Sequence, residues 1–183
     1  MRINSGIARG RHLKSVPNES TRPVTDRVKQ AVFNILAGDV LDSRWLDLFA
    51  GTGAVGIEAL SRGARAATFV DIEPAAIRTI KENLQITGLA DRAIVIRSDA
   101  FEFIRAKPNT SFDFIYVAPP QYQGLWVRAL AAIDENVGWL DPDGAVIVQL
   151  DPQEFAPMPL INLELVDQRR YGKTMLLFYE RSS

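Results

Sequence analysis

Short apolar runs and helical repeats alternate along most of the chain. The runs, which predict buried strands, occupy residues 44–49, 66–70, 93–97, 112–117 and 145–150. Apolar residues spaced by three or four positions, which predict helices, fall between them at residues 54–62, 74–87, 100–104 and 126–133. This alternation predicts an α/β domain in which helices cover both faces of a parallel sheet.

The end of the chain departs from that alternation. Asp141-Pro142-Asp143-Gly144 predicts a turn before the strand at 145–150. Residues 161–168 and 174–180 then predict two strands joined at 170–173. We therefore expect the parallel sheet to be closed by an antiparallel hairpin.

The start of the chain predicts a small extension. Residues 2–4 and 12–16 suit two short strands joined through a glycine-containing turn. A helical repeat follows the loop after them and is expected to stop at Gly38. We divide the chain on this basis into an extension of residues 1–38 and a main domain of residues 39–183.

A glycine-rich stretch follows the first strand of the main domain. Gly51, Gly53 and Gly56 match the dinucleotide-binding fingerprint, and Asp71 has the spacing of its ribose-binding acid. Asp47 narrows the choice of ligand, because a carboxylate at the strand end accepts hydrogen bonds from a cationic amine but repels a pyrophosphate. S-adenosylmethionine carries an ammonium and a sulfonium and no phosphate. The pattern therefore favours this cofactor, and a nicotinamide-dependent oxidoreductase or an ordinary glycine turn are the alternatives.

Polar or turn-forming residues stand at four consecutive strand ends: Asp47, Asp71, Asp99 and the pair Pro119-Pro120. Ligands of open α/β sheets bind outside the carboxyl ends of the strands, so we expect these residues to share one site. Asp71 is predicted to bind ribose hydroxyls, and its alternative is an exposed strand-end carboxylate. Asp99 is predicted to accept from an adenine amine, and the N-cap of the next helix is its alternative.

Composition limits the chemistry. At 183 residues and 47% apolar content, the chain is expected to form one soluble domain with a small appendage. It has no cysteine, which removes thiolate metal sites and cysteine nucleophiles, and with His12 as its single histidine we expect no metal. No apolar run is long enough to cross a bilayer and no signal peptide is apparent, so we expect no membrane contact and a cytoplasmic protein.

Basic residues are concentrated at the start of the chain. Residues 1–30 hold seven of the 21 basic side chains and two of the 22 acidic ones. A basic arm on an acidic body favours contact with a polyanion such as RNA, and a solvated, flexible terminus is the alternative. The side chains expected to contact phosphates are Arg2, Arg9, Arg11, Lys14, Arg22 and Arg27.

A set of segments spread over nearly the whole chain forms a recognisable pattern: Met1–Ile3, Arg9–Arg11 with Leu13, Thr21–Val28, Phe33–Leu36, Leu46–Gly53, Glu58–Ala64 and Tyr171–Thr174. Together they resemble one known family, the RsmD-type small-subunit rRNA guanine-N2 methyltransferases. The resemblance implies a Rossmann-like class I methyltransferase with a mostly parallel seven-stranded sheet, an antiparallel C-terminal hairpin and a small N-terminal hairpin and helix. It also implies methyl transfer from S-adenosylmethionine to a guanine amine of 16S rRNA in an assembled or assembling small subunit, by a protein that we expect to be a monomer.

The resemblance also assigns candidate residues to two sites. Those expected to bind the cofactor are Asp47, Phe49, Gly51, Thr52, Gly53, Asp71, Ile72, Asp99 and Ala100. Those expected at the catalytic turn after strand four are Ala118, Pro119, Pro120, Gln121 and Tyr122.

The catalytic turn departs from the family motif, Asp/Asn-Pro-Pro-Tyr/Phe. Ala118 stands at the acid or amide position and Gln121 at the aromatic position, with Tyr122 one place later. Three interpretations stay open. Gln121 and Tyr122 take over the hydrogen-bonding and stacking roles, or the protein binds cofactor and rRNA as an assembly factor without catalysis, or it modifies a different group or base.

Overall fold

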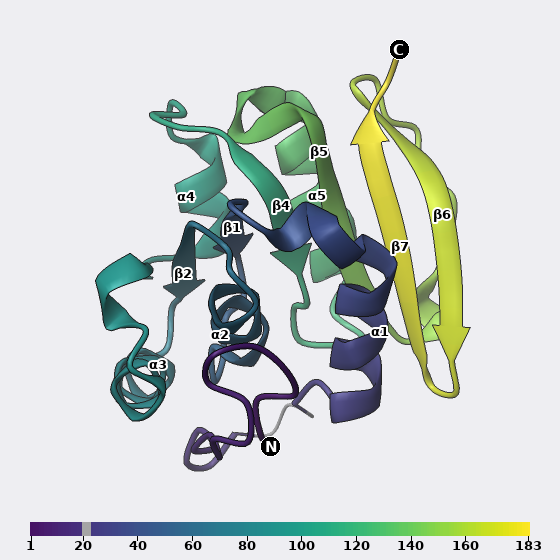
Figure 1. Ribbon diagram of the computed structural model, residues 1–183. Coiled ribbons are helices and arrows are strands. Elements are labelled where there is room, and N and C mark those ends of the chain that lie inside the picture. The colour runs from purple at the N-terminus through teal and green to yellow at the C-terminus, as the bar shows by residue number, and fades with distance from the viewer. Residues whose placement is uncertain (20–22) are drawn as a thin grey trace.

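Seven strands form one sheet in the computed structural model, which describes residues 1–19 and 23–183. The strand order is β3-β2-β1-β4-β5-β7-β6 (Figure 1). The strands are β1 (Arg44–Asp47), β2 (Ala66–Asp71), β3 (Ala93–Arg97), β4 (Phe112–Val117), β5 (Leu140–Leu150), β6 (Leu163–Tyr171) and β7 (Thr174–Arg181). The first five are parallel, whereas β7 runs antiparallel to both β5 and β6. The predicted α/β sheet with an antiparallel end is confirmed.

In the described part of the chain, five α-helices connect and cover the strands: α1 (Asp26–Leu36), α2 (Ala54–Ser61), α3 (Pro74–Thr87), α4 (Ala100–Arg105) and α5 (Leu125–Glu135). Short 3-10 turns lie at Ala37–Val40, Ala90–Arg92, Val137–Trp139 and Pro152–Glu154. Figure 1 shows α1 and α2 in front of the sheet and α5 behind it. Each face is closed by its own hydrophobic cluster, one with α1, α2 and α3 and one with α4 and α5. Helices on both faces follow from the right-handed parallel crossovers.

Two local predictions need correction. The turn expected at Asp141–Gly144 lies inside β5 as an irregularity, where the register shifts from Phe112↔Leu140 to Phe114↔Ala145. Pairing of both flanks with β4 absorbs the extra residues as a bulge. The helix expected to stop at Gly38 ends earlier, at Leu36, because Ala37 adopts a φ of 47°.

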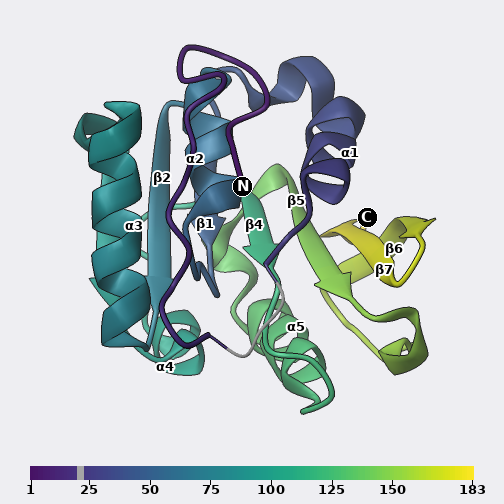
Figure 2. The same ribbon diagram turned by 90° about the horizontal axis from the view of Figure 1, so that it is seen from below.

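The N-terminal hairpin is shorter than predicted. The described residues pair through one isolated antiparallel bridge, Arg2↔His12, in place of two strands. The Ile3 and Leu13 amides donate to Arg11 O and Met1 O, each at 2.9 Å, which keeps the two arms together. Figure 2 shows this segment running along α2 and α3.

Buried charges attach the hairpin to the helices. Lys29 Nζ on α1 donates to Arg2 O at 2.6 Å, and Glu58 on α2 accepts from the Asn4 amide at 3.0 Å. Both side chains are fully buried. Burial lowers the pKa of Lys29 and raises the pKa of Glu58, although Arg62 bonds Glu58 at 3.2 Å and stabilises its charge. We call Lys29, Glu58, Arg62 and their hairpin partners, Arg2 and Asn4, the arm clamp.

Candidate functional site

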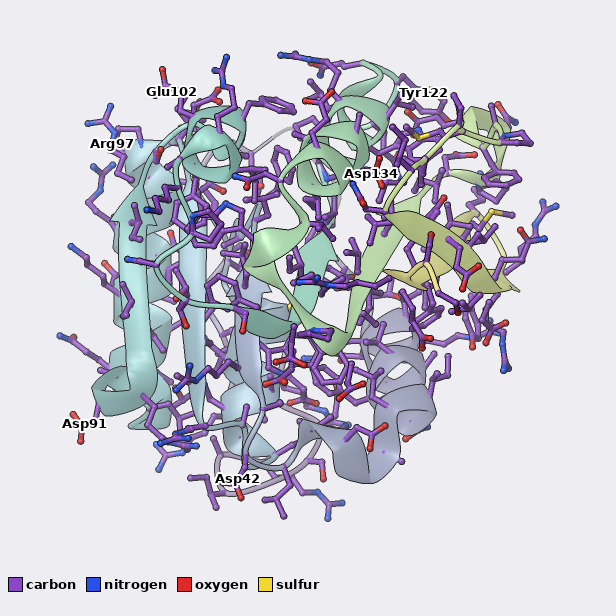
Figure 3. The ribbon with its side chains drawn as sticks, turned by 90° about the horizontal axis from the view of Figure 1, so that it is seen from above. Asp42, Asp91, Arg97, Glu102, Tyr122 and Asp134 are labelled. Atoms are coloured by element: carbon purple, nitrogen blue, oxygen red, sulfur yellow. The ribbon has the colours of Figure 1, made fainter. Side chains whose placement is uncertain are left out.

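A cleft of about 1640 Å³ opens at the carboxyl ends of the parallel strands. The strand order changes direction between β1 and β4, where a crevice of an α/β sheet is expected. Arg97, Glu102 and Tyr122, which line the cleft, lie at one end of the molecule in Figure 3, and Asp42 and Asp91 lie at the other. The lining falls into two parts, a β1–β3 half at the ends of β1, β2 and β3, and a β4–β5 half at the ends of β4 and β5 with the β6–β7 turn.

The glycine-rich stretch forms the loop that connects β1 to α2. Gly51 and Gly53 have φ of 56° and 80°, a conformation that glycine adopts without a steric cost. Gly51 and Thr52 line the cleft, whereas Gly53 is the N-cap residue of α2 and does not line it. A Cβ on Gly56 would lie 2.4 Å from the Phe69 ring, so this glycine allows α2 to pack closely on β2.

Asp71 is fixed by the backbone on two sides. Its Oδ2 accepts from the Gly51 amide at 2.8 Å and its Oδ1 accepts from the Glu73 amide at 2.9 Å. Each carboxylate oxygen has a second lone pair, so the group can still accept two hydroxyl protons. The half-buried Asp71 and the exposed Ile72 both line the cleft beside the glycine loop. The spacing of Gly51 and Asp71 thus corresponds to a direct contact.

Asp47 lies at the floor of the β1–β3 half. It is 3% exposed, and its Oδ2 accepts from the Gly56 amide at 3.3 Å. Burial is the main cause that raises the pKa of Asp47 to about 8; the charge of Asp71 acts in the same direction, and the hydrogen bond from the Gly56 amide opposes the shift. No cationic side chain of the described residues forms an ion pair with Asp47. A ligand ammonium placed beside Asp47 would supply the missing counter-charge.

Asp99 caps α4, as its alternative role anticipated. Its Oδ1 accepts from the Phe101 and Glu102 amides at 2.8 and 3.1 Å. Within the described residues no donor is bonded to Oδ2, so the cap leaves one oxygen for a ligand amine. Asp99 and Ala100 line the cleft, and the Phe49 and Phe101 rings meet nearby, edge to face, at 6.1 Å.

The turn after β4 lines the other half of the cleft, from Ala118 to Tyr122. Tyr122 adopts a φ of 62° and is 63% exposed. Its hydroxyl donates to Asp151 Oδ2 at 2.5 Å and its amide donates to Glu154 Oε1 at 2.7 Å. The hydrogen bond from Tyr122 lowers the pKa of Asp151, and Lys173 and Arg170 lower it further. Tyr122 is therefore tied to the residues after β5.

Sequence reasoning missed two polar residues in the β4–β5 half. The buried Tyr116 hydroxyl donates a short hydrogen bond to Gln149 Oε1, and both residues line the cleft. Burial raises the pKa of Tyr116, and the neighbouring Asp47 charge raises it further, so this hydroxyl keeps its proton. A signal for Gln149 was present, because it is the single polar side chain of the apolar run at 145–150.

The predicted RNA-contacting residues lie outside the cleft. Arg2, Arg9, Arg11, Lys14 and Arg27 are exposed and none of them lines it, and Arg22 falls outside the described residues. Arg11 donates to Ile86 O near the end of α3, while Ala76 near the start of α3 lines the cleft. At 1.5 Å per residue the two points are about 15 Å apart. Lys14 forms an ion pair with Glu82 at 3.0 Å.

Other cations line the cleft itself. They are Arg97, Arg105, Arg128 and Lys173. The Arg128 guanidinium stacks over the Phe101 ring at 4.1 Å, and Arg105 Nε donates to Phe101 O at 3.3 Å. The Arg128 contact links α5 with α4, whereas the Arg105 contact lies within α4.

Two other kinds of site are absent from residues 1–19 and 23–183. No group of three or more His, Asp or Glu side chains is arranged to hold a metal ion in this part of the chain. No helix described there has the length and apolar character that crossing a membrane requires.

The sheet order, the glycine loop after β1 and the acids after β2 and β3 define a Rossmann-like methyltransferase fold. A solved protein from Escherichia coli superposes with a TM-score of 0.87 at 35% identity, covering 99% of this chain and 97% of that one. An RNA methyltransferase from Salinibacter ruber, solved with S-adenosyl-L-homocysteine, shares the fold with a TM-score of 0.66 at 16% identity over 87% of this chain and 93% of that one.

The family follows from the sequence comparisons. A family model described as conserved hypothetical protein 95 matches residues 1–180. Ribosomal RNA small subunit methyltransferase D of Escherichia coli K12 is 34% identical over 183 residues, which cover 100% of this chain and 91% of that protein. The chain belongs to this family, that of ribosomal RNA small subunit methyltransferase D.

Proposed function

We propose that this protein transfers a methyl group from S-adenosylmethionine to the exocyclic N2 amine of a guanine in 16S rRNA. The observation that carries the proposal is the convergence of four strand ends, with Asp47, Asp71, Asp99 and the Pro119-Pro120 turn, on one cleft. Family membership supports the same reaction, because a full-length relative is named as a small-subunit rRNA methyltransferase.

The β1–β3 half fits the cofactor. Asp71 would bind the ribose hydroxyls, Asp99 Oδ2 the adenine amine, and Asp47 the ammonium, with Phe49, Gly51, Thr52, Ile72 and Ala100 around them. The left-handed conformation of Gly53 lets the loop turn into α2. When bound, S-adenosylmethionine would supply a methyl group on sulfur: an N–C bond would form as the S–C bond breaks, the electron pair would stay on sulfur, and the amine proton would pass to solvent water.

The β4–β5 half would receive the base. A guanine amine is a weak nucleophile, because its lone pair is delocalised into the ring, so hydrogen-bond acceptors that orient its two protons are needed. The base must also leave its stack to enter a cleft, and Pro119, Pro120, Gln121 and Tyr122 offer the surface for it. Ala118 contributes no side-chain acceptor.

The whole chain would engage the small subunit or an assembly intermediate. We infer that the extension, residues 1–38, contacts rRNA phosphates through Arg2, Arg9, Arg11, Lys14, Arg22 and Arg27, while residues 39–183 hold the cofactor. These side chains face solvent wherever the structure describes them, which suits a polyanion partner. We further propose that the protein acts as a monomer in the cytoplasm, where the small subunit assembles.

The decisive experiment combines calorimetry with transfer of labelled methyl. The native protein should bind S-adenosylmethionine and label N2 of a guanine in unmodified small subunits, located by digestion and mass spectrometry. Cofactor binding without transfer, together with transfer by Ala118→Asp, would reject catalysis by the native chain.

That outcome would support a second candidate, a non-catalytic assembly factor that keeps the cofactor site. Ala118 is the observation that favours it, since deleting a preorganised hydrogen-bonding group costs on the order of 10² to 10³ in rate. Absence of cofactor binding would reject both candidates.

A further inference from the structure

We propose that Gln149 supplies the hydrogen-bond acceptor that Ala118 lacks, and so positions the substrate amine. The inference rests on the proposed methyl transfer to a base amine and assigns its acceptor site to a residue of β5. Within the described residues, the Gln149 side chain is hydrogen-bonded to the Tyr116 hydroxyl, and it lines the β4–β5 half of the cleft.

The sheet register brings Gln149 to the site that Ala118 leaves empty. β4 and β5 are parallel and pair Val117 with Val148. Continuing by one residue places Ala118 beside Gln149, with backbones roughly 4.8 Å apart. The two side chains project to the same face of the sheet as Tyr116, which precedes Ala118 by two residues. A long amide from β5 can therefore occupy the space that a short acid or amide on residue 118 would fill.

Tyr116 holds the Gln149 amide in one orientation. Its hydroxyl donates to Gln149 Oε1 from a side chain that is 1% exposed, so it has little freedom to turn away. Tyr116 also pairs in register with Asp47 on β1. The register partner of Tyr116 on β5 is Ile147, and the Tyr116 hydroxyl reaches two residues further along that strand to Gln149. Tyr116 thus connects Asp47 in the β1–β3 half with Gln149 in the β4–β5 half.

The Gln149 amide retains the groups that an amine-bearing base requires. Oε1 has a second lone pair, and within the described residues no acceptor is bonded to Nε2. Guanine carries its N2–H donor next to the N3 acceptor on one edge of the ring. A carboxamide can accept from the amine and donate to that ring nitrogen at once. Gln149 would form only hydrogen bonds, and no covalent bond to it is made or broken.

Tyr122 is less suited to this role. Its hydroxyl is bonded to Asp151 and its ring is 63% exposed at the mouth of the cleft. This position suits stacking on an entering base rather than accepting its amine protons. Gln149, half-buried at the end of β5, is the more enclosed of the two.

The test uses Gln149→Leu, which keeps the size of the side chain and removes its polar groups. The single-turnover rate of methyl transfer to unmodified small subunits should fall on the order of 10² to 10³-fold, with cofactor affinity by calorimetry within about twofold of native. Adding Ala118→Asn should recover at least about tenfold, because it returns an amide to the neighbouring strand. Gln168→Leu, at an exposed glutamine of β6, is the matched control and should leave both quantities unchanged.

A purely structural role of Gln149 predicts a different pattern. Gln149→Leu leaves the buried Tyr116 hydroxyl without its acceptor, whereas Tyr116→Phe with Gln149→Leu removes both partners and should restore the melting temperature. If the double variant also regains the native rate, the proposal fails. It fails equally if Gln149→Leu transfers methyl within about threefold of native, although the proposed function then survives. Absence of transfer by the native protein would instead reject the proposed function.

Discussion

The two halves of the cleft are built differently. In the β1–β3 half, backbone amides hold the acids: Gly51 and Glu73 hold Asp71, and Phe101 and Glu102 hold Asp99. In the β4–β5 half, side chains from distant segments hold one another, as in Tyr116 with Gln149 and Tyr122 with Asp151. Backbone contacts and glycine spacing therefore specify the β1–β3 half, whereas side-chain contacts formed by the tertiary fold specify the β4–β5 half.

Asp71→Ala should have the largest effect, and this effect should fall on the β1–β3 half alone. The change removes the proposed ribose acceptor and leaves the Gly51 and Glu73 amides without their partner. Cofactor affinity measured by calorimetry should fall on the order of 10² to 10³-fold, because hydrogen bonds to charged groups are the strong ones. Asp91→Ala, on the opposite end of the molecule, is the control. A loss below about tenfold would mean that ribose is bound elsewhere.

Asp47→Asn should stabilise the fold but lower the affinity of the β1–β3 half for the cofactor. Burial raises the pKa of Asp47 from 3.8 to about 8, so between these values the unfolded chain is ionised and the folded chain holds the proton. Native stability is therefore lost as pH rises through this window, and the neutral amide escapes the loss. Thermal unfolding from pH 4 to 8 measures this difference. The free energy of unfolding of the Asp47→Asn variant should exceed that of the native protein by an amount that grows with pH, on the order of a few kcal/mol at most.

The same group should couple cofactor binding to protons. An ammonium beside Asp47 favours its carboxylate, so binding near pH 7 should release a proton, and affinity should rise with pH toward the pKa of about 8. Calorimetry in buffers of different ionisation enthalpy measures the release. Asp47→Asn should abolish it and weaken binding about tenfold. Equal proton release by both proteins would place the ammonium away from Asp47.

The double variant Arg9→Ala with Arg11→Ala tests whether the N-terminal hairpin contributes to RNA binding in addition to the cleft. Each lost phosphate contact should reduce the slope of log affinity against log salt by about one, and affinity should fall several-fold at moderate salt. Arg78→Ala with Lys81→Ala on α3 removes the same charge from exposed positions and serves as the control. If both double variants reduce the salt slope equally, the loss reflects overall charge, and the hairpin makes no specific contact with RNA.

Tyr122→Phe should have the smallest effect. It removes the hydrogen bond to Asp151 at an exposed site but keeps the ring for stacking. The methylation rate should fall a few-fold at most, while Tyr122→Ala should weaken binding of the base by about 1–3 kcal/mol. Equal rates for the two variants would show that the ring does not stack on the substrate.

The difference between the halves also explains what the sequence predicts. The α/β order follows from periodicity and is confirmed. The Asp99 cap is the alternative to the predicted adenine contact, and the spacing of Gly51 and Asp71 corresponds to a hydrogen bond. The cofactor contacts of both acids stay predictions. The polarity of Gln149 within an apolar run is visible in the sequence, but its place beside Ala118 depends on the β4–β5 register, which no local pattern encodes. The bulge at Asp141–Gly144 is mistaken for a turn, since a turn and a bulge use the same residue types and differ only in what pairs on either side.

The arm clamp limits how the N-terminal hairpin can be studied. Deleting the hairpin would remove Arg2 O and the Asn4 amide from the buried Lys29 and Glu58, and breaking buried charged contacts costs about 3–5 kcal/mol. Total stability of a domain is only about 5–15 kcal/mol. A truncated protein that lost RNA binding could simply have unfolded. The hairpin is thus not a detachable module, and its contribution to binding has to be measured one outward-facing side chain at a time.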